Sequence, residues 1–234
     1  FKPVTKKTWT IKNAKEIPKT FSDAFKLTMS PRRGPVCINL PRNILANKEN
    51  FKINEKNQSF DNQNSTKAKS NYIKKAVKII SNSNKIVIIA GGGIKYTSKY
   101  KNVIRLAEFL NAPMVTAAGH GDAIPFSHKL NAGQMGPRGN PVASKLVKEA
   151  SVIIALGTRL GFNSTFYSYE NINKRAKIIQ IELEKSMIGR YFPVAVGING
   201  DAATVADQLY KEIKKQNIIL NIKKWTNSYL IERK

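Results

Sequence analysis

The hydrophobic positions after residue 70 follow two spacings that alternate along the chain. Short, continuously apolar runs predict buried strands at residues 85–90, 113–117, 152–156, 178–182 and 195–198. Apolar residues three and four positions apart predict helices before and between them, with inward-facing sets at Ile73, Ala76, Val77 and Ile80, at Tyr100, Val103, Ile104, Ala107 and Leu110, at Ala143, Leu146, Val147 and Ala150, and at Ala202, Val205, Ala206, Leu209 and Ile213. Buried strands that alternate with amphipathic helices predict an α/β fold with a doubly wound parallel sheet.

Two of these helices carry a start signal. Asn140 precedes Pro141, and Asp201 precedes the last apolar periodic segment, so each is predicted to cap the N-terminus of its helix. Residues 118–139, between a strand and a helix, are rich in glycine and are predicted to form one long loop.

Residues 1–47 are predicted to be part of a domain. A helix with one apolar face and a strand at 35–40 are expected there, the face being formed by Ile17, Phe21, Ala24, Phe25 and Met29. One helix and one strand cannot bury their own apolar surfaces. Residues 48–70 are dominated by Asn, Lys, Ser, Gln and Glu, which is typical of a linker. We therefore predict a second domain at 71–216 and, at 217–234, the start of a connection to a further domain.

The composition indicates a globular protein. With 234 residues, 41% of them hydrophobic, the chain is able to form a real core, and no apolar stretch approaches the roughly 20 residues that cross a bilayer. The N-terminus has no start methionine and no signal-peptide pattern, so we expect a cytoplasmic protein, cut from a longer chain, with no membrane partner. The single cysteine, Cys37, lies in an apolar run and is expected to be a small buried side chain rather than a catalytic thiol.

The formal net charge of +25 would ordinarily point to nucleic acid or another anionic partner. Here the lysines are spread through nearly every segment, with no aromatic-interleaved basic block and no nucleic-acid-binding motif. Solvated lysine faces explain this distribution better, so nucleic acid is disfavoured as a partner. A stand-alone basic module that binds nucleotides or nucleic acid is the alternative from a different functional class.

Three consecutive glycines, Gly91, Gly92 and Gly93, follow the strand at 85–90 and precede a helical segment. Glycine lets the backbone turn sharply and approach a ligand, and a helix N-terminus offers unpaired N–H groups to phosphate. These glycines are therefore predicted to contact a nucleotide. The dinucleotide fingerprint is incomplete, because its third glycine position holds Tyr96 and no acidic residue ends the next strand. A hydride-transferring NAD enzyme is thus disfavoured.

Two further candidates stand at strand ends. Arg159 follows the strand at 152–156. A guanidinium at this position is able to bind a phosphate through two parallel hydrogen bonds. An ion pair or hydrogen bond from Arg159 to a neighbouring domain is an equally good interpretation. Glu182 ends the strand at 178–182 and is predicted to accept a ribose hydroxyl, with a solvated charge as the alternative.

The glycine-rich loop supplies the remaining candidates. Gly133 and Gly136 permit close approach of a ligand, and Arg138 beside them is placed to neutralise a phosphate. His120 lies between glycines and is expected at the surface. Neither His120 nor His128 has cysteine or carboxylate partners at metal-ligand spacing, so no metal site is predicted.

Five segments, in order along the chain, resemble thiamine diphosphate-dependent enzymes of the acetolactate synthase group. GPVCINLPRN at 34–43 resembles the segment that closes their pyrimidine-binding domain, with Asn43 where Asp is usual. The others resemble successive landmarks of their central domain: IIAGGG at 88–93, LGTR at 156–159, AKIIQIE at 176–182 with Ile188 and Gly189, and VGINGDA at 196–202. The resemblance covers nearly the whole chain.

This resemblance implies a Rossmann-like central domain, preceded by a helix-strand fragment of the pyrimidine-binding domain. The parent enzyme then uses thiamine diphosphate and Mg²⁺, and its partners are the missing domains of the same chain, assembled as a homodimer or homotetramer. The central domain of such enzymes is structural or binds FAD or ADP. In FAD-binding relatives, an arginine that matches Arg159 contacts the cofactor, and a loop that matches 133–139 lies next to the flavin.

The resemblance also bears on the reaction. Residues 156–165, 176–180 and 193–202 are most similar to sulfoacetaldehyde acetyltransferases, which convert sulfoacetaldehyde and phosphate to acetyl phosphate and sulfite. Acetolactate synthases, which join pyruvate units, are the near alternative. The family's catalytic glutamate and its Gly-Asp-Gly…Asn metal motif are both absent, and Asp201, in Gly-Asp-Ala, caps a helix instead. No catalytic or metal-binding residue is therefore assigned, and the isolated chain is expected to be inactive.

Overall fold

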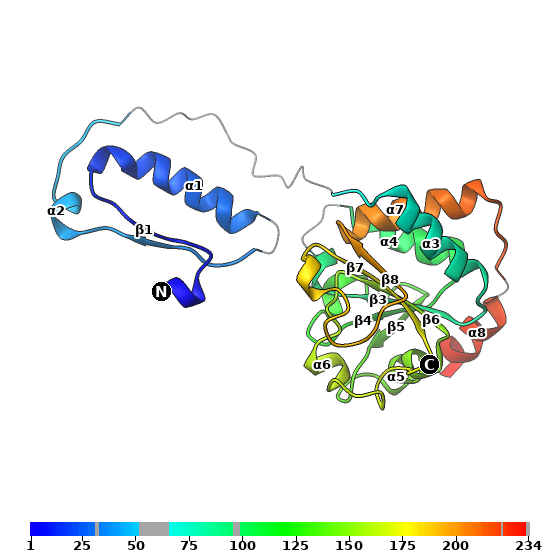
Figure 1. Cartoon of the computed structure of the whole chain (residues 1–234). Helices are drawn as coiled ribbons and strands as arrows, with labels where there is room; N and C mark the ends of the chain where they lie inside the picture. Colours follow the sequence, from blue (N-terminus) through cyan, green and yellow to red (C-terminus); the bar gives the residue numbers. More distant parts are fainter. Residues whose placement is uncertain (31–32, 52–65, 96–98, 221, 233–234) are drawn as a thin grey trace. The chain divides into compact units, whose positions relative to one another are not determined.

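The computed structural model describes residues 1–30, 33–51, 66–95, 99–220 and 222–232 (Figure 1). By its internal contacts the chain divides into two compact units, Phe1–Asn64 and Ser65–Lys234. The division falls within the predicted linker, of which residues 52–65 lie outside the described residues. Each unit buries apolar residues of its own.

The second unit is built on a six-stranded sheet in which all neighbouring strands are parallel. The order is β5-β4-β3-β6-β7-β8, formed by β3 (Ile86–Ala90), β4 (Met114–Thr116), β5 (Asn131–Gln134), β6 (Val152–Leu156), β7 (Lys177–Glu182) and β8 (Val196–Asn199). From β3 the chain adds β4 and then β5 on one side of the sheet. It then returns to the centre and adds β6, β7 and β8 in turn on the other side of β3. The predicted doubly wound, Rossmann-like α/β fold is confirmed, with its topological switch point between β3 and β6.

Helices cover both faces of this sheet (Figure 1). One layer contains α3 (Ser70–Ser81), α4 (Lys101–Leu110) and α7 (Ala202–Lys215), and the other contains α5 (Pro141–Glu149) and α8 (Lys223–Glu232). Side chains of β3 alternate between the layers, with Ile86 and Ile88 in the first core and Val87 and Ile89 in the second. All four are fully buried, and burying each contributes about 1.5–3 kcal/mol. Burial on both faces explains why the strand is an unbroken apolar run.

Both predicted N-caps are confirmed. Asn140 Oδ1 accepts hydrogen bonds from the N–H groups of Val142 and Ala143, at 2.8 and 3.3 Å. Asp201 Oδ1 accepts one from the N–H of Thr204, at 2.8 Å. These N–H groups belong to the first turn of α5 and α7, where no acceptor is available within the helix.

Part of the predicted long loop is a strand. β5 lies within residues 118–139 and pairs with β4, with Met114 opposite Asn131 and Thr116 opposite Gln134. Its four residues, NAGQ, form an edge strand without an apolar run, so hydrophobic patterning gave no signal for it. The same segment contains a 3-10 turn, η4 (Gly121–Ala123).

The chain after β3 also differs from the predicted strand, turn and helix. A 3-10 turn, η3 (Gly92–Ile94), follows Gly91, and α4 begins only at Lys101. The three glycines therefore do not stand at the N-terminus of an α-helix. The remaining short elements of this unit are α6 (Phe162–Thr165) and the 3-10 turn η5 (Lys185–Met187).

The C-terminal segment, predicted to lead to a further domain, packs on the second unit as far as it is described. Ile222 is fully buried, and Tyr229 is 5% exposed. Thr226 Oγ1 donates a hydrogen bond to the carbonyl of Asn111 at 2.7 Å. Among the described residues, no helix has both the length and the apolar character that crossing a bilayer requires.

The first unit contains a strand that the hydrophobic pattern did not predict. β1 (Thr8–Thr10) pairs in parallel with β2 (Cys37–Asn39). The other elements are α1 (Ile17–Met29), α2 (Arg42–Leu45) and the 3-10 turns η1 (Lys2–Val4) and η2 (Ala14–Glu16). The buried cluster of this unit consists of Ile11, Ala14 and Ile44.

Apolar side chains of the first unit remain exposed. Phe21 and Phe25, on the predicted apolar face of α1, are 37% and 57% exposed. The prediction that Cys37 is buried was wrong, because its side chain is only partly covered. A two-stranded sheet and a helix offer too little surface to cover these groups.

Replacing Asn140 with alanine should lower the free energy of unfolding by about 0.5–2 kcal/mol, because two N–H groups of α5 lose their acceptor. Asn140→Ser should keep most of the stability, since serine is also a strong N-cap residue. Urea denaturation followed by far-UV circular dichroism measures both variants. Equal stability of Asn140→Ala and wild type would contradict the capping role.

Candidate functional site

Loops from several strands meet at the carboxyl edge of the six-stranded sheet. Because the strands are all parallel, the loops that follow β3, β4, β6 and β7 emerge at the same edge. The loops after β3 and β6 carry Gly91–Gly93 and Arg159, and His120 follows β4. This edge is the place where a doubly wound fold binds ligands.

The loops after β3 and β6 touch through their backbones. The N–H of Gly91 donates to the carbonyl of Leu156 and the N–H of Gly93 to that of Gly157, both at 2.9 Å. A methyl group on Gly91 would stand 2.3 Å from the Gly157 oxygen, and one on Gly93 would stand 2.8 Å from Gly157 Cα. Gly157 has a φ of +60°, which glycine adopts without strain. Packing therefore requires glycine on both sides of the switch point.

The imidazole of His120 lies against Gly92. A methyl group on Gly92 would stand 2.6 Å from Cε1 of the ring and 3.0 Å from both ring nitrogens. His120, expected at the surface, is thus half-buried, and its Nδ1 has no hydrogen-bond partner in the described part of the chain. Burial lowers the pKa of His120 below its ordinary value of 6.5; Lys95 and Arg159 also lower it, and Asp122 opposes them. The neutral ring is favoured at this position.

Arg159 is exposed, and its positive charge acts to lower the pKa of His120 and of two tyrosines, Tyr167 and Tyr191. The rings of Tyr167 and Tyr191 stack with their centroids 4.3 Å apart. Their mutual hydrogen bond raises the pKa of Tyr167 and lowers that of Tyr191, whose ring lies 5.6 Å from the guanidinium of Arg190. The edge around Arg159 is therefore cationic and aromatic.

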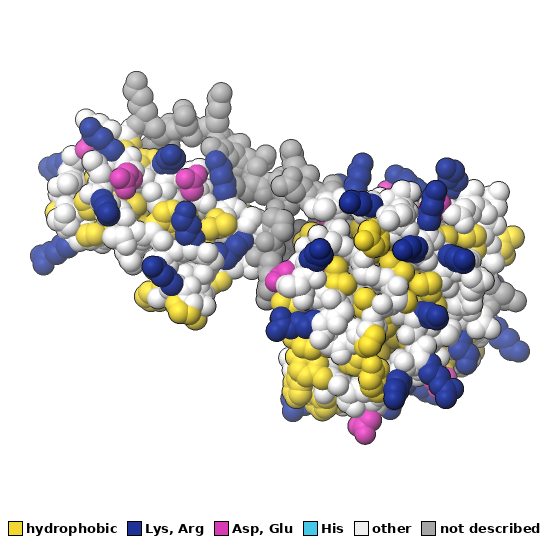
Figure 2. Space-filling model, in the orientation of Figure 1, with side chains coloured by type: hydrophobic (Ala, Val, Ile, Leu, Met, Phe, Trp, Pro, Cys, Tyr) yellow, Lys and Arg dark blue, Asp and Glu magenta, His cyan; other side chains and the backbone are white. Residues whose placement is uncertain are grey.

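An exposed aromatic surface continues from this pair over α6. Phe162 and Phe166, 53% and 42% exposed, stack with their ring centroids 4.9 Å apart. Phe162 also lies 5.5 Å from Tyr167, ring to ring. Figure 2 shows hydrophobic side chains gathered on the second unit where Figure 1 draws α6. Exposed apolar groups at this density are typical of contact surfaces.

Gln180 organises this edge, although the sequence did not single it out. The side chain is 2% exposed in the middle of β7. Its Nε2 donates to the carbonyls of Thr158 and Met187, at 3.0 and 3.4 Å, and its Oε1 accepts the N–H of Gly189 at 2.8 Å. One amide thus joins the loops after β6 and β7. The available signal was a polar residue inside an otherwise apolar strand.

The predicted residues of the glycine-rich loop have contacts of their own. Gly133 and Gly136 have left-handed φ angles of +99° and +111°. The N–H of Gly133 donates to Asn131 Oδ1 at 2.9 Å, and that of Gly136 donates to Ser144 Oγ at 3.3 Å. Arg138 is exposed.

Glu182, at the end of β7, is two strands away from β3 in the sheet. Its Oε1 accepts the N–H of Leu183 at 2.9 Å. Assignment of a ligand to the whole set stays a prediction: Gly91, Gly92, Gly93, Gly133, Gly136, Arg138, Arg159 and Glu182.

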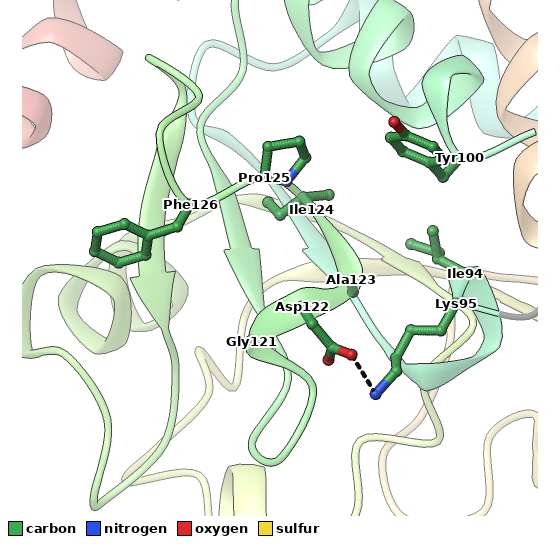
Figure 3. Close-up of a pocket in the computed structure, with 9 residues that line it drawn as sticks. All are labelled: Ile94, Lys95, Tyr100, Gly121, Asp122, Ala123, Ile124, Pro125 and Phe126. Atoms are coloured by element: carbon green, nitrogen blue, oxygen red, sulfur yellow. Dashed lines mark ion pairs between the residues drawn. The ribbon is translucent and has the colours of Figure 1, made fainter.

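A pocket of about 500 Å³ opens beside η3 and η4, at residues that no sequence motif marked (Figure 3). Ile94, Lys95 and Tyr100 line one wall, and residues 121–126 line the other. Lys95 joins the two walls through an ion pair of 2.8 Å with Asp122, which lowers the pKa of that carboxyl group. Apart from this pair, the lining is mainly apolar and aromatic.

The described residues contain no group of three or more His, Cys, Asp or Glu side chains that is arranged to hold a metal ion. His128 is 3.2 Å from Glu108 Oε1, and its Nδ1 accepts the N–H of Leu130. A divalent cation needs several oxygen or nitrogen donors at one point, so neither histidine supplies such a site with its neighbours.

The comparisons with known proteins concern almost the whole chain. The family described as thiamine pyrophosphate enzyme, central domain, matches residues 73–209. The chain is 34% identical over 212 residues to a probable acetolactate synthase large subunit of Methanocaldococcus jannaschii, which covers 89% of this chain and 36% of that protein. It is 34% identical over 215 residues to a sulfoacetaldehyde acetyltransferase of Alcaligenes xylosoxydans xylosoxydans, with 91% of this chain and 35% of that protein covered.

A third relative matches over both units. The acetolactate synthase large subunit of Buchnera aphidicola subsp. Schizaphis graminum is 32% identical over 233 residues, with 97% of this chain and 40% of that protein covered. The chain therefore spans well under half the length of these curated relatives.

Replacing Gln180 with leucine should lower the free energy of unfolding by about 1–3 kcal/mol, because it leaves the N–H of Gly189 and the carbonyl of Thr158 without these partners. Gln216→Leu, at an exposed position, is the matched control and should change it by less than about 0.5 kcal/mol. Denaturant titration compares the two. A Gln180→Leu protein as stable as its control would contradict the organising role.

Stability should also fall as the pH drops below 6.5, because the unfolded chain then protonates His120 more readily than the folded chain does. This contribution is fully present above the unfolded pKa and is lost as the pH falls toward the lowered folded pKa. Denaturation between about pH 5 and pH 8 measures it. His120→Gln should remove this component and His128→Gln should retain it; identical profiles for wild type and His120→Gln would show that His120 makes no such contribution.

Proposed function

Because this chain belongs to the thiamine pyrophosphate enzymes, whose central domain it contains, we propose that its parent protein is a thiamine diphosphate-dependent enzyme that transfers a two-carbon acyl unit. The observation that carries this proposal is the family match over residues 73–209, on a six-stranded Rossmann-like sheet. Both classes of relative, acetolactate synthase and sulfoacetaldehyde acetyltransferase, support chemistry of this kind.

For the reaction itself we propose sulfoacetaldehyde acetyltransferase activity, in which sulfoacetaldehyde and phosphate give acetyl phosphate and sulfite. Support comes from 34% identity to such an enzyme and from the local similarity at 156–165, 176–180 and 193–202. Acetolactate synthase activity on pyruvate is the second candidate, and identities of 34% and 32% to acetolactate synthase large subunits support it about as well.

Thiamine diphosphate and Mg²⁺ are proposed to bind elsewhere in the parent. The described residues do not fit these groups, since no cluster of metal-binding side chains is present among them. When bound, thiamine diphosphate supplies a nucleophilic carbon and an electron sink. The part proposed for this chain is structural: its exposed Arg138 and Arg159 and its aromatic surface over α6 face the remaining domains, in a parent that is a homodimer or homotetramer.

Flavin or ADP was the other ligand that the resemblance implied for this domain. A Rossmann-type phosphate site needs free backbone N–H groups at a helix N-terminus. Gly91 and Gly93 already donate theirs to Leu156 and Gly157, and the turn after them is η3 rather than an α-helix. The residues present therefore do not fit a pyrophosphate group at this turn, and we propose no step that uses one.

The isolated chain should show no turnover of pyruvate, or of sulfoacetaldehyde with phosphate, in the presence of thiamine diphosphate and Mg²⁺. The full-length parent should form acetyl phosphate and sulfite only when both sulfoacetaldehyde and phosphate are present. Sulfite release and acetyl hydroxamate formation measure this reaction, and acetolactate formation from pyruvate measures the alternative. Formation of acetolactate alone would replace the first candidate by the second, and turnover by the isolated chain would contradict the fragment interpretation.

A further inference from the structure

Most of the glycines predicted to contact a ligand donate their backbone N–H groups to other parts of this chain. Four of the five donate their N–H groups to protein acceptors: Gly91 to Leu156, Gly93 to Gly157, Gly133 to Asn131 and Gly136 to Ser144. A phosphate held by a glycine-rich loop takes its affinity from such N–H groups when they point at the ligand. In this domain they stabilise loop contacts instead.

The space beside these glycines is filled by protein atoms. An added methyl group would stand 2.3 Å from the Gly157 oxygen at Gly91 and 2.9 Å from the Asn163 oxygen at Gly136. Both atoms belong to the backbone, which cannot move aside as a flexible side chain would. The glycines of the two loops thus let another part of the same chain approach their backbone closely. In a nucleotide site, the ligand would occupy that space.

His120 completes the closure over the central glycine. Its ring lies where a methyl group on Gly92 would come within 2.6 Å of Cε1. The Nδ1 atom is buried against the protein rather than open to a cavity. A ligand that approached Gly92 from this side would have to displace the imidazole.

We infer that the carboxyl edge between β3 and β6 is closed by the chain's own backbone and by His120, so that the central domain takes neither flavin nor adenine nucleotide. The glycine-rich turns are packing elements of a self-filled crevice. The parent would then carry out its reaction without a flavin on this domain. This inference concerns binding by the chain itself and is independent of the activity proposed for the parent.

Titration of the whole chain with FAD and, separately, with ADP tests the inference directly. Calorimetry and flavin fluorescence should show no saturable binding up to about 1 mM ligand. A salt concentration of about 200 mM screens general attraction to the net charge of +25. Saturable binding of either compound under these conditions would overturn the inference.

A pair of alanine substitutions tests the packing that closes the edge. Gly92→Ala should lower the Tm by more than a glycine-to-alanine change in open space does, because the new methyl group must displace the His120 ring. In the His120→Ala background the same change should cost much less, and the double variant should remain as stable as His120→Ala alone. This comparison holds even if Gly92→Ala by itself fails to fold.

Gly121→Ala is the matched control. Gly121 lies in the same loop as His120, and nothing stands within 4 Å of the position that its methyl group would take. Its Tm should change by no more than about 2 °C. If Gly92→Ala is as mild as this control, or is equally costly with and without the His120 ring, His120 does not close the crevice and the inference fails.

Discussion

The contact on which the second unit depends joins the backbones of two loops at the topological switch point. Gly91 and Gly93 on one side meet Gly157 on the other, and both of the first two donate hydrogen bonds across the junction at 2.9 Å. These bonds prolong the ladder between β3 and β6, the two central strands of the sheet. A side chain at Gly91 would push apart the pair of strands that both hydrophobic layers cover.

Other features of the edge follow from this contact. Because the loop after β6 is held against β3, Arg159 emerges from a fixed backbone two residues beyond Gly157. Gln180 extends the connection to the loop after β7, since its amide binds both Thr158 and Gly189. Hydrogen-bonded inner loops therefore present the exposed Arg159 and a stack of aromatic rings at this edge.

An edge of this kind supports a structural role better than a catalytic one. The interior of the edge is closed by packing, and the exposed groups, Phe162, Phe166 and Arg159, form a surface of the kind that binds a neighbouring domain. The chain spans only 35% to 40% of the length of the relatives it matches. Under our proposal, this surface contacts other domains of the parent, and those domains carry the chemistry.

The sequence by itself determined the α/β architecture, the core strands and the N-caps, because each of these depends on residues within a few positions of one another. The run at 86–90 is apolar because two layers cover it, and Asn140 caps a helix two residues away. The sequence did not predict β1 and β5, because such short strands carry no run of apolar residues and are stabilised by pairing with neighbouring strands.

The role of the glycine-rich turns was decided only by the tertiary structure. A glycine triplet shows that something must approach the backbone closely, but the approaching group comes from another loop. Here that group is Gly157 or the ring of His120, each distant in sequence from Gly91–Gly93. Gln180 likewise has its effect through partners on two loops. The sequence shows where a glycine or a buried polar residue occurs. Only the folded chain shows which atoms lie beside it.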